Sequence, residues 1–327
     1  MGRTALVRTT RSVRLAAAAV TLTAALGACA RAADVEPRSS APARAVATVA
    51  IDSAAMIRDI GVLAHDSMEG RAVGSAGSAK ARAFLEARFR AVGVQPFGTS
   101  YLQPFTFPGR GQEVQGVNIV GQVRGTTLPD RYIVITAHYD HVGVRNGQIF
   151  NGADDNASGT AALLAIADYF VKNRPRHSLI FAALDAEETN LQGARAFVAS
   201  PPVPKQAIAL DINMDMISRN DAGELYVAGT YSYPQLLPFV ERAVAAAEVK
   251  LIPGHDRPGV AGSDDWTSQS DHGAFHAAGI PFLYFGVEDH ADYHRATDDV
   301  ERIQPGFYAR AVRTIITATR LLDAGLN

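Results

Sequence analysis

Short runs of β-branched and apolar residues alternate with segments whose apolar residues recur at helical spacing, between residues 117 and 322. The runs at 117–123, 132–137, 178–184, 207–214 and 280–286 predict strands, and the segments at 157–171, 234–247 and 305–322 predict helices. Pro234 and Pro305 suit first helical turns, and Asn156 or Ser158 can cap the first of these helices. The alternation predicts an α/β domain with a mixed, mostly parallel central sheet flanked by helices. We expect the first two strands to be neighbours, because only a short turn segment joins them.

The first 28 residues differ from the rest of the chain. A head with four arginines and no acid precedes an uncharged stretch that is too short to span a bilayer comfortably, which is typical of a secretory signal peptide. The sequence Leu26-Gly27-Ala28-Cys29 resembles the lipobox of bacterial lipoproteins. We therefore expect a signal peptide at 1–28, a flexible tether at 29–48 and one folded domain at 49–327. The alternatives are a plain signal peptide cut nearby and a buried helix.

The protein is accordingly expected to be exported and lipid-anchored at Cys29 in the cell envelope, or secreted. Ala30 follows the cysteine where an aspartate would favour retention at an inner membrane, so an outer-membrane or periplasmic location is expected. The lipid is the only membrane contact that the sequence predicts.

Composition excludes several classes of protein. The formal net charge of -2 lacks the basic excess of nucleic-acid-binding proteins, so no nucleic-acid partner is expected. The single cysteine excludes an intrachain disulfide framework, a cysteine-based zinc site and, because it lies in the lipobox, a thiol protease. The sequence contains neither His-Glu-x-x-His nor Gly-x-Ser-x-Gly, the motifs of two common hydrolase classes.

Histidines and carboxylates follow the predicted strands at the points where the strands end. They are His138 and Asp140, Asp154 and Asp155 at a helix start, Glu187 and Glu188, Asp215, and finally His294 next to Tyr293. In isolation, an aspartate pair could cap a helix and a glutamate pair could lie on an exposed helix face. Because the carboxyl ends of parallel strands meet at one edge of a sheet, the whole set predicts a single site there.

The residue types indicate a metal site. Nitrogen and oxygen ligands without sulfur suit zinc, with manganese or cobalt as possible alternatives. Two histidines and three carboxylates are more than one catalytic zinc usually takes. If one carboxylate bridges, they divide into two sites of three ligands each, with room for a shared water.

These motifs resemble the co-catalytic zinc exopeptidases of metallopeptidase family 28, over roughly residues 51–322. The motifs, in the family's order, are His138-Tyr139-Asp140, residues 152–159 (Gly-Ala-Asp-Asp-Asn-Ala-Ser-Gly), Glu187-Glu188, Asp215, and Tyr293-His294 with Asp298 beyond. Met68-Glu69-Gly70-Arg71 also looks like the family. The resemblance implies an α/β exopeptidase fold, two zinc ions and a peptide substrate.

The resemblance also implies a role for each residue. Asp154 would bridge the two zinc ions, with Glu188 and His294 completing one site, and His138 and Asp215 the other. Glu187 would be the general base, Asp140 would orient His138, Asp298 would orient His294, and Tyr293 would donate to the oxyanion. The Asp154–Asp155 peptide would be cis. Ser270-Asp271-His272 matches a segment near the family's pocket, or else caps a helix, and His141 has no ligand role in the family pattern.

The sequence alone leaves several functions open. An aminopeptidase is favoured; a dipeptidase, a glutamate carboxypeptidase or a glutaminyl cyclase would share the fold, and a non-catalytic receptor-like relative would have lost ligands that are present here. Loops at 226–233 and 254–267 are expected to shape the specificity pocket, but their sequence does not predict which side chain is preferred.

Overall fold

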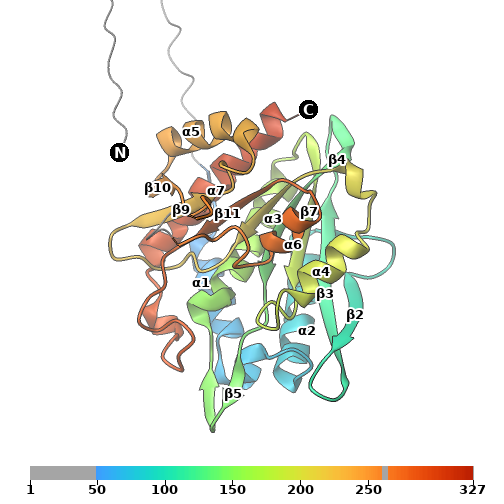
Figure 1. Ribbon diagram of the computed structural model, residues 1–327, viewed down its shortest axis with the longest axis vertical. Helices are drawn as coiled ribbons and strands as arrows, with labels where there is room; N and C mark the ends of the chain where they lie inside the picture. Colours follow the sequence, from blue (N-terminus) through green and yellow to red (C-terminus); the bar gives the residue numbers. More distant parts are fainter. Residues whose placement is uncertain (1–48, 260–263, 327) are drawn as a thin grey trace, which may run out of the picture. The chain divides into compact units, whose positions relative to one another are not determined.

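The computed structural model describes residues 49–259 and 264–326 (Figure 1). The helices are α1 (Ser53–Leu63), α2 (Ala76–Val92), α3 (Gly159–Lys172), α4 (Gln192–Ala199), α5 (Leu237–Ala246), α6 (His272–Ala277) and α7 (Pro305–Gly325). The strands are β1 (Gln95–Pro96), β2 (Leu102–Pro108), β3 (Glu113–Val123), β4 (Leu128–His138), β5 (Gly143–Arg145), β6 (Gln148–Phe150), β7 (His177–Leu184), β8 (Ile208–Met214), β9 (Glu224–Ala228), β10 (Lys250–Pro253) and β11 (Phe282–Gly286). The predicted signal peptide, Cys29 and the tether lie outside the described residues. Among the described helices, none is long and apolar enough to cross a membrane.

Nine of the eleven described strands form one sheet in the order β1-β3-β7-β4-β8-β11-β9-β10, with β2 paired to β3, and β5 and β6 form a separate two-stranded sheet. The four central strands β7, β4, β8 and β11 are mutually parallel, while β3 and β9 join them antiparallel. The mixed, mostly parallel sheet predicted from the alternation of elements is therefore confirmed. The expected pairing of β3 with β4 is wrong, because β7 lies between them and pairs with both.

Both faces of the central strands are buried, which explains why these strands have continuous apolar sequences. Alternate side chains point to opposite faces. Ile133 and Ile135 of β4 belong to the larger core beneath α1, α2, α3 and α7, whereas Val134 belongs to a second core with Phe197 of α4 and Phe275 of α6. Helices thus cover both faces and leave the strand ends free to carry the site (Figure 1).

The predicted helix starts are found with one adjustment. Pro234 and Pro305 occupy first turns, as expected. The helix predicted from residue 157 becomes regular only at Gly159, because an irregular turn, Ala153–Ser158, precedes it. Asn156 provides the cap through its Oδ1, which accepts the Gly159 N–H at 2.8 Å.

Candidate metal centre and active site

The parallel strands β4, β7, β8 and β11 end at the same edge of the sheet, and the predicted motifs follow them there. The structure brings five of the predicted residues together: His138, Glu187, Glu188, Asp215 and His294. Asp155 joins them from the irregular turn before α3. The convergence expected from strand topology is thus found in the fold.

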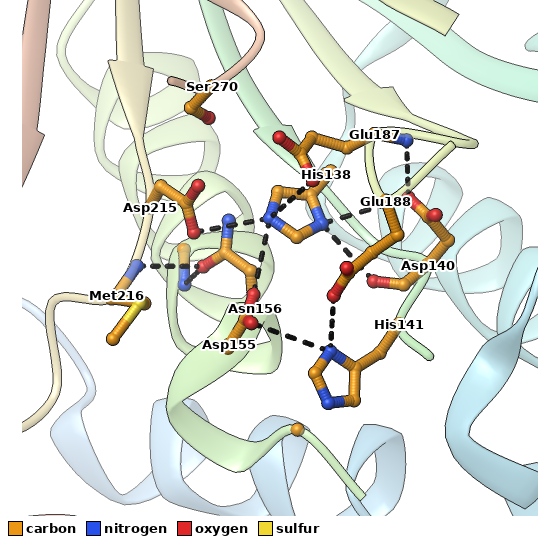
Figure 2. A network of polar contacts seen from close by, with 12 residues as sticks. His138, Asp140, His141, Asp155, Asn156, Glu187, Glu188, Asp215, Met216 and Ser270 are labelled. Carbon is orange, nitrogen blue, oxygen red and sulfur yellow. Dashed lines mark hydrogen bonds and ion pairs between the residues drawn. The ribbon is translucent and has the colours of Figure 1, made fainter. Parts of the chain in front are cut away.

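Two groups of candidate metal ligands share Asp155. Figure 2 shows Asp155 between His138 and Asp215 of one group and His141 and Glu188 of the other. In the first group, His138 Nε2 lies 3.4 Å from Asp155 Oδ1 and 3.1 Å from Asp215 Oδ1. In the second, His294 Nε2 lies 3.1 Å from Asp155 Oδ2 and 3.2 Å from Glu188 Oε2. One oxygen of the Asp155 carboxylate therefore faces each group, which is the arrangement that a bridging ligand requires.

Asp154 is in neither group, contrary to the prediction that it would bridge. Its Oδ1 accepts hydrogen bonds from the Ser218 N–H at 2.8 Å and hydroxyl at 2.7 Å, and its Oδ2 lies 3.0 Å from His290 Nε2. The cis peptide also lies one bond later than predicted, between Asp155 and Asn156. The physical reason is that successive side chains of the turn point apart, so only one aspartate of the pair can face the ligands. Asp154 instead ties the turn to two other loops.

The resemblance implied that Asp298 would orient His294, but Asp298 does not contact it. Its carboxylate accepts the backbone N–H groups of Asp154 and Asp155 at 3.0–3.1 Å. Burial raises the pKa of Asp298 to about 7, and the neighbouring Asp154 charge adds to the shift. Asp298 therefore positions the turn that carries Asp155.

Glu187 lies beside both groups without belonging to either. Its Oε2 is 4.0 Å from His138 Nε2, and its backbone N–H donates to Asp140 Oδ1 at 3.0 Å. Asp140 Oδ1 is also 3.7 Å from His138 Nδ1, so this carboxylate lies where it can hold both residues. The position predicted for Asp140, behind His138, agrees with this arrangement.

The buried polar atoms of the donor set fit a metal ion. Within the described parts of the chain, Asp155 Oδ2, Glu188 Oε1 and His141 Nδ1 are buried and have no hydrogen-bond partner. Burial raises the pKa of Asp155 and of Glu187, and nearby carboxylates add to both shifts. Against the cost of burial, histidine contacts lower the pKa of Glu188 and of Asp215, so these two carboxylates stay ionised. Contacts with Asp155 and Glu188 raise the pKa of His294 to about 10. A divalent cation ligated by oxygen and nitrogen would satisfy both the charge and the unpaired atoms.

The comparisons with known proteins agree with this chemistry. The sequence profile of peptidase family M28 matches residues 118–319. The chain belongs to peptidase family M28. A probable zinc metalloprotease of Leptosphaeria maculans is 32% identical over 169 residues, which are 48% of this M28 chain and 37% of that protein. The chain spans well under half the length of the curated relatives that it matches.

Two solved structures share the fold of this M28 chain. A zinc aminopeptidase from Bacillus subtilis has a TM-score of 0.68 at 17% identity, covering 83% of this chain and 95% of that one. A glutaminyl cyclase from Porphyromonas gingivalis has a TM-score of 0.68 at 18% identity, covering 86% and 100%. At these identities the likeness concerns the fold. The family match itself shows membership of a peptidase family.

A cavity of about 570 Å³ opens beside the two ligand groups of the M28 chain. Its acidic residues are Asp155, Glu187, Glu188, Asp215 and Asp289, and its apolar wall includes Leu191, Met216, Trp266, Tyr284 and Val287. Tyr293 also lines it, with its ring stacked on His294 at 4.0 Å between centroids. The cavity therefore combines a negative floor with an apolar side.

The segment Ser270-Asp271-His272 supports this pocket. His272 lies 2.7 Å from the Trp266 carbonyl oxygen through Nε2 and 3.2 Å from Asn213 Nδ2 through Nδ1. Asp271 precedes α6 but makes no capping bond with its side chain, and Ser270 Oγ accepts from Asn213. Two segments, 226–233 and 254–267, were expected to shape the pocket. Trp266 of the second lines the cavity, and Tyr226 of the first packs against Trp266.

Arg71 supports the site, although the sequence predicted no role for it beyond the likeness of Met68-Glu69-Gly70-Arg71 to the family. It is fully buried, and it donates to the carbonyl oxygens of Leu63, Tyr139, Asn151 and Gly152 at 2.6–3.0 Å. Burial lowers the pKa of Arg71 to about 10, so the side chain stays charged at neutral pH. Arg71 therefore joins the loop after β4 to the turn that carries Asp155.

We expect Arg71→Ala to lower the free energy of unfolding by about 3–5 kcal/mol, because four buried carbonyl oxygens lose their donor. Urea unfolding monitored by circular dichroism measures this change. Arg58→Ala is the matched control, since Arg58 is 67% exposed and should cost within about 0.5 kcal/mol. A loss for Arg71→Ala as small as that of the control would show that Arg71 does not hold these loops.

Proposed function

We propose that this protein is a zinc-dependent aminopeptidase that removes the N-terminal residue of peptides and holds two zinc ions that share Asp155. The observation that carries the proposal is the Asp155 carboxylate, whose two oxygens face two separate groups of ligands. His138 and Asp215 would complete one site, and Glu188 and His294 the other. When bound, the paired zinc ions would polarise the scissile carbonyl and make an attacking water more acidic.

The residues of the chain would do the remaining work. Glu187 is the proposed general base: it borders the cavity beside His138, accepts the proton of the attacking water and passes it to the leaving amine. Asp140 would hold Glu187 and His138 in their positions, because its carboxylate contacts both. Tyr293, which lines the cavity next to His294, is the proposed donor to the oxyanion.

Recognition of a free amino terminus is supported by the charge of the cavity. Five carboxylates line it, and the basic residues among its lining are His294 and Arg195. Zinc would hold Asp155, Glu188 and Asp215, which leaves Asp289 to attract a positively charged α-ammonium group and to repel an acidic first side chain. Trp266, Tyr284 and Val287 form an apolar wall that suits an uncharged first side chain.

A dipeptidase is the second candidate, and Arg195 favours it. Arg195 lines the cavity from α4 and donates through Nε to the Asn190 carbonyl oxygen at 3.0 Å. Its terminal nitrogens make no hydrogen bond or ion pair with other described residues, so they are free to receive a C-terminal carboxylate.

Blocked peptides distinguish the two candidates. We expect acetylation of the N-terminus of a leucyl tripeptide to lower kcat/KM by roughly 100-fold or more, because the acetyl group removes the charge that pairs with Asp289 and adds bulk where the amino terminus has to fit. Amidation of the C-terminus should change it less than about 3-fold, which is the size expected for an exposed charge contact. Release of free leucine, measured by chromatography, provides the readout.

The reverse pattern, in which amidation of the tripeptide abolishes cleavage and acetylation is tolerated, would favour a carboxypeptidase. Cleavage of a leucyl dipeptide with both termini free, without cleavage of the tripeptide, would favour the dipeptidase. Formation of pyroglutamate from an N-terminal glutaminyl peptide, without release of an amino acid, would instead favour a cyclase.

The export signal and lipid anchor at Cys29 remain proposals that labelling with a radioactive fatty acid can test.

A further inference from the structure

His141 is a buried histidine with unusual surroundings. Its side chain is fully shielded from solvent; among the described residues its Nε2 has no polar partner, and its Nδ1 makes no well-aligned hydrogen bond although it lies 2.7 Å from Glu188 Oε1. Leaving buried polar atoms unpaired costs about 1–3 kcal/mol for each atom. By contrast, His272 makes close polar contacts through both of its nitrogens. The polar contacts of His141 are thus with the carboxylates of the ligand cluster, and not with neutral hydrogen-bonding groups of the fold.

Two carboxylate oxygens from two other residues converge on His141. Its Nδ1 lies 2.7 Å from Glu188 Oε1 and 3.6 Å from Asp155 Oδ2, ion-pair contacts that are not aligned as hydrogen bonds. Figure 2 shows the ring pointing at both carboxylates. With His294, these residues form a group of four whose donor atoms lie within 4.8 Å of one another.

The ring of His141 is also held in place by its neighbours. Gly152 has a φ of 55°, and a Cβ atom there would lie 2.5 Å from His141 Cδ2 and 2.6 Å from Cγ. On another side, the His294 ring contacts it edge-on, with centroids 5.7 Å apart. The backbone and a neighbouring ligand thus fix the direction of Nδ1 toward the carboxylates.

We propose that His141 is a fourth protein ligand, which makes the two metal sites unequal. Zinc in proteins usually takes four ligands, and a catalytic zinc keeps one position for water or substrate. The group of His141, Asp155, Glu188 and His294 fills all four positions with protein atoms, whereas the group of His138, Asp155 and Asp215 leaves one open. The first site therefore binds zinc tightly as a closed site, and the open site takes the water and the substrate. This inference rests on the proposed two-zinc function.

Zinc binding measured without reference to activity tests the proposal. The metal-free protein is titrated with Zn²⁺ in competition with a chromophoric chelator, and bound zinc is counted by mass spectrometry. We expect two equivalents bound in two phases for the wild type. His141→Asn should weaken the tighter phase by roughly 100-fold or more, because even groups that only orient a ligand contribute about 10–100-fold. The weaker phase should change less than about 3-fold, as for a group outside its ligand set.

A direct readout of coordination covers the case in which His141→Asn folds poorly. In His141→Cys loaded with Co²⁺, a thiolate ligand at this position produces a charge-transfer absorption band in the near ultraviolet, which the Co²⁺-loaded wild type lacks. His255→Cys is the matched control, since His255 stacks on Trp266 beside the cavity and lies outside both ligand groups. It should give no band.

The outcomes separate the two proposals. Two equivalents of zinc in the wild type, with both phases unchanged in His141→Asn and no band in His141→Cys, would overturn the role of His141 and leave the two-zinc function standing. A wild-type protein that binds fewer than two equivalents would overturn the two-zinc function and the closed site with it.

Discussion

Asp155→Asn will reduce bound zinc from two equivalents to one or fewer, and will lower the affinity for the remaining ion by roughly 100-fold or more. The reason is that both oxygens of this carboxylate face ligands: Oδ1 lies 3.4 Å from His138 Nε2, and Oδ2 lies 3.1 Å from His294 Nε2. An amide has the same shape but is neutral and a poor zinc ligand. Zinc counted by mass spectrometry after gel filtration measures the effect.

Asp154→Asn is the isosteric control one residue away. Its carboxylate accepts from Ser218 and contacts His290, so the substitution should cost about 1–3 kcal/mol of stability while the protein retains two equivalents of zinc. If Asp154→Asn lost its zinc and Asp155→Asn kept it, the assignment of the bridging residue made here would be reversed.

Glu187→Gln will lower kcat by about 10²–10⁴-fold, the usual contribution of a general base, while zinc content stays at the wild-type value. The glutamate borders the cavity and contacts His138 only at 4.0 Å, outside both ligand groups. Its backbone N–H bond to Asp140 does not involve the substituted atoms, so its placement should survive. Steady-state kinetics with a leucyl substrate, together with metal analysis, measures both quantities.

Glu188→Gln is the matched comparison, because the neighbouring carboxylate belongs to a ligand group and its loss should release zinc. A Glu187→Gln protein with near wild-type turnover would refute the role of Glu187 as base. If it instead lost zinc as Glu188→Gln does, then Glu187 would have to be a ligand.

The strand ends were predictable from sequence because burial on both faces leaves a continuous apolar run that stops where polar residues begin. That signal located His138, Glu187, Glu188 and Asp215 at one sheet edge. It says nothing of strand order, and this is why the adjacency of β3 and β4 was predicted wrongly. A short connection between two strands does not require them to pair: β7 lies between β3 and β4 in the sheet.

The choice between Asp154 and Asp155 could not be made from the sequence. Both lie in an irregular turn with no periodicity, where one residue of shift turns a side chain from the ligands to the opposite side. The hydrogen bonds that decide the matter come from residues far along the chain, Ser218 and Asp298. The sequence did place His141 in the same strand-end motif as His138. Only the structure shows that its ring faces the carboxylates of Asp155 and Glu188.

The proposed zinc aminopeptidase activity, with two ions that share Asp155, can be followed directly during a zinc titration. Metal-free protein is given increasing Zn²⁺, and hydrolysis of leucine amide is followed at each step. We expect no release of leucine without metal and a rate that reaches its plateau at two equivalents of zinc per chain. A plateau at one equivalent, or hydrolysis that persists without metal, would contradict it.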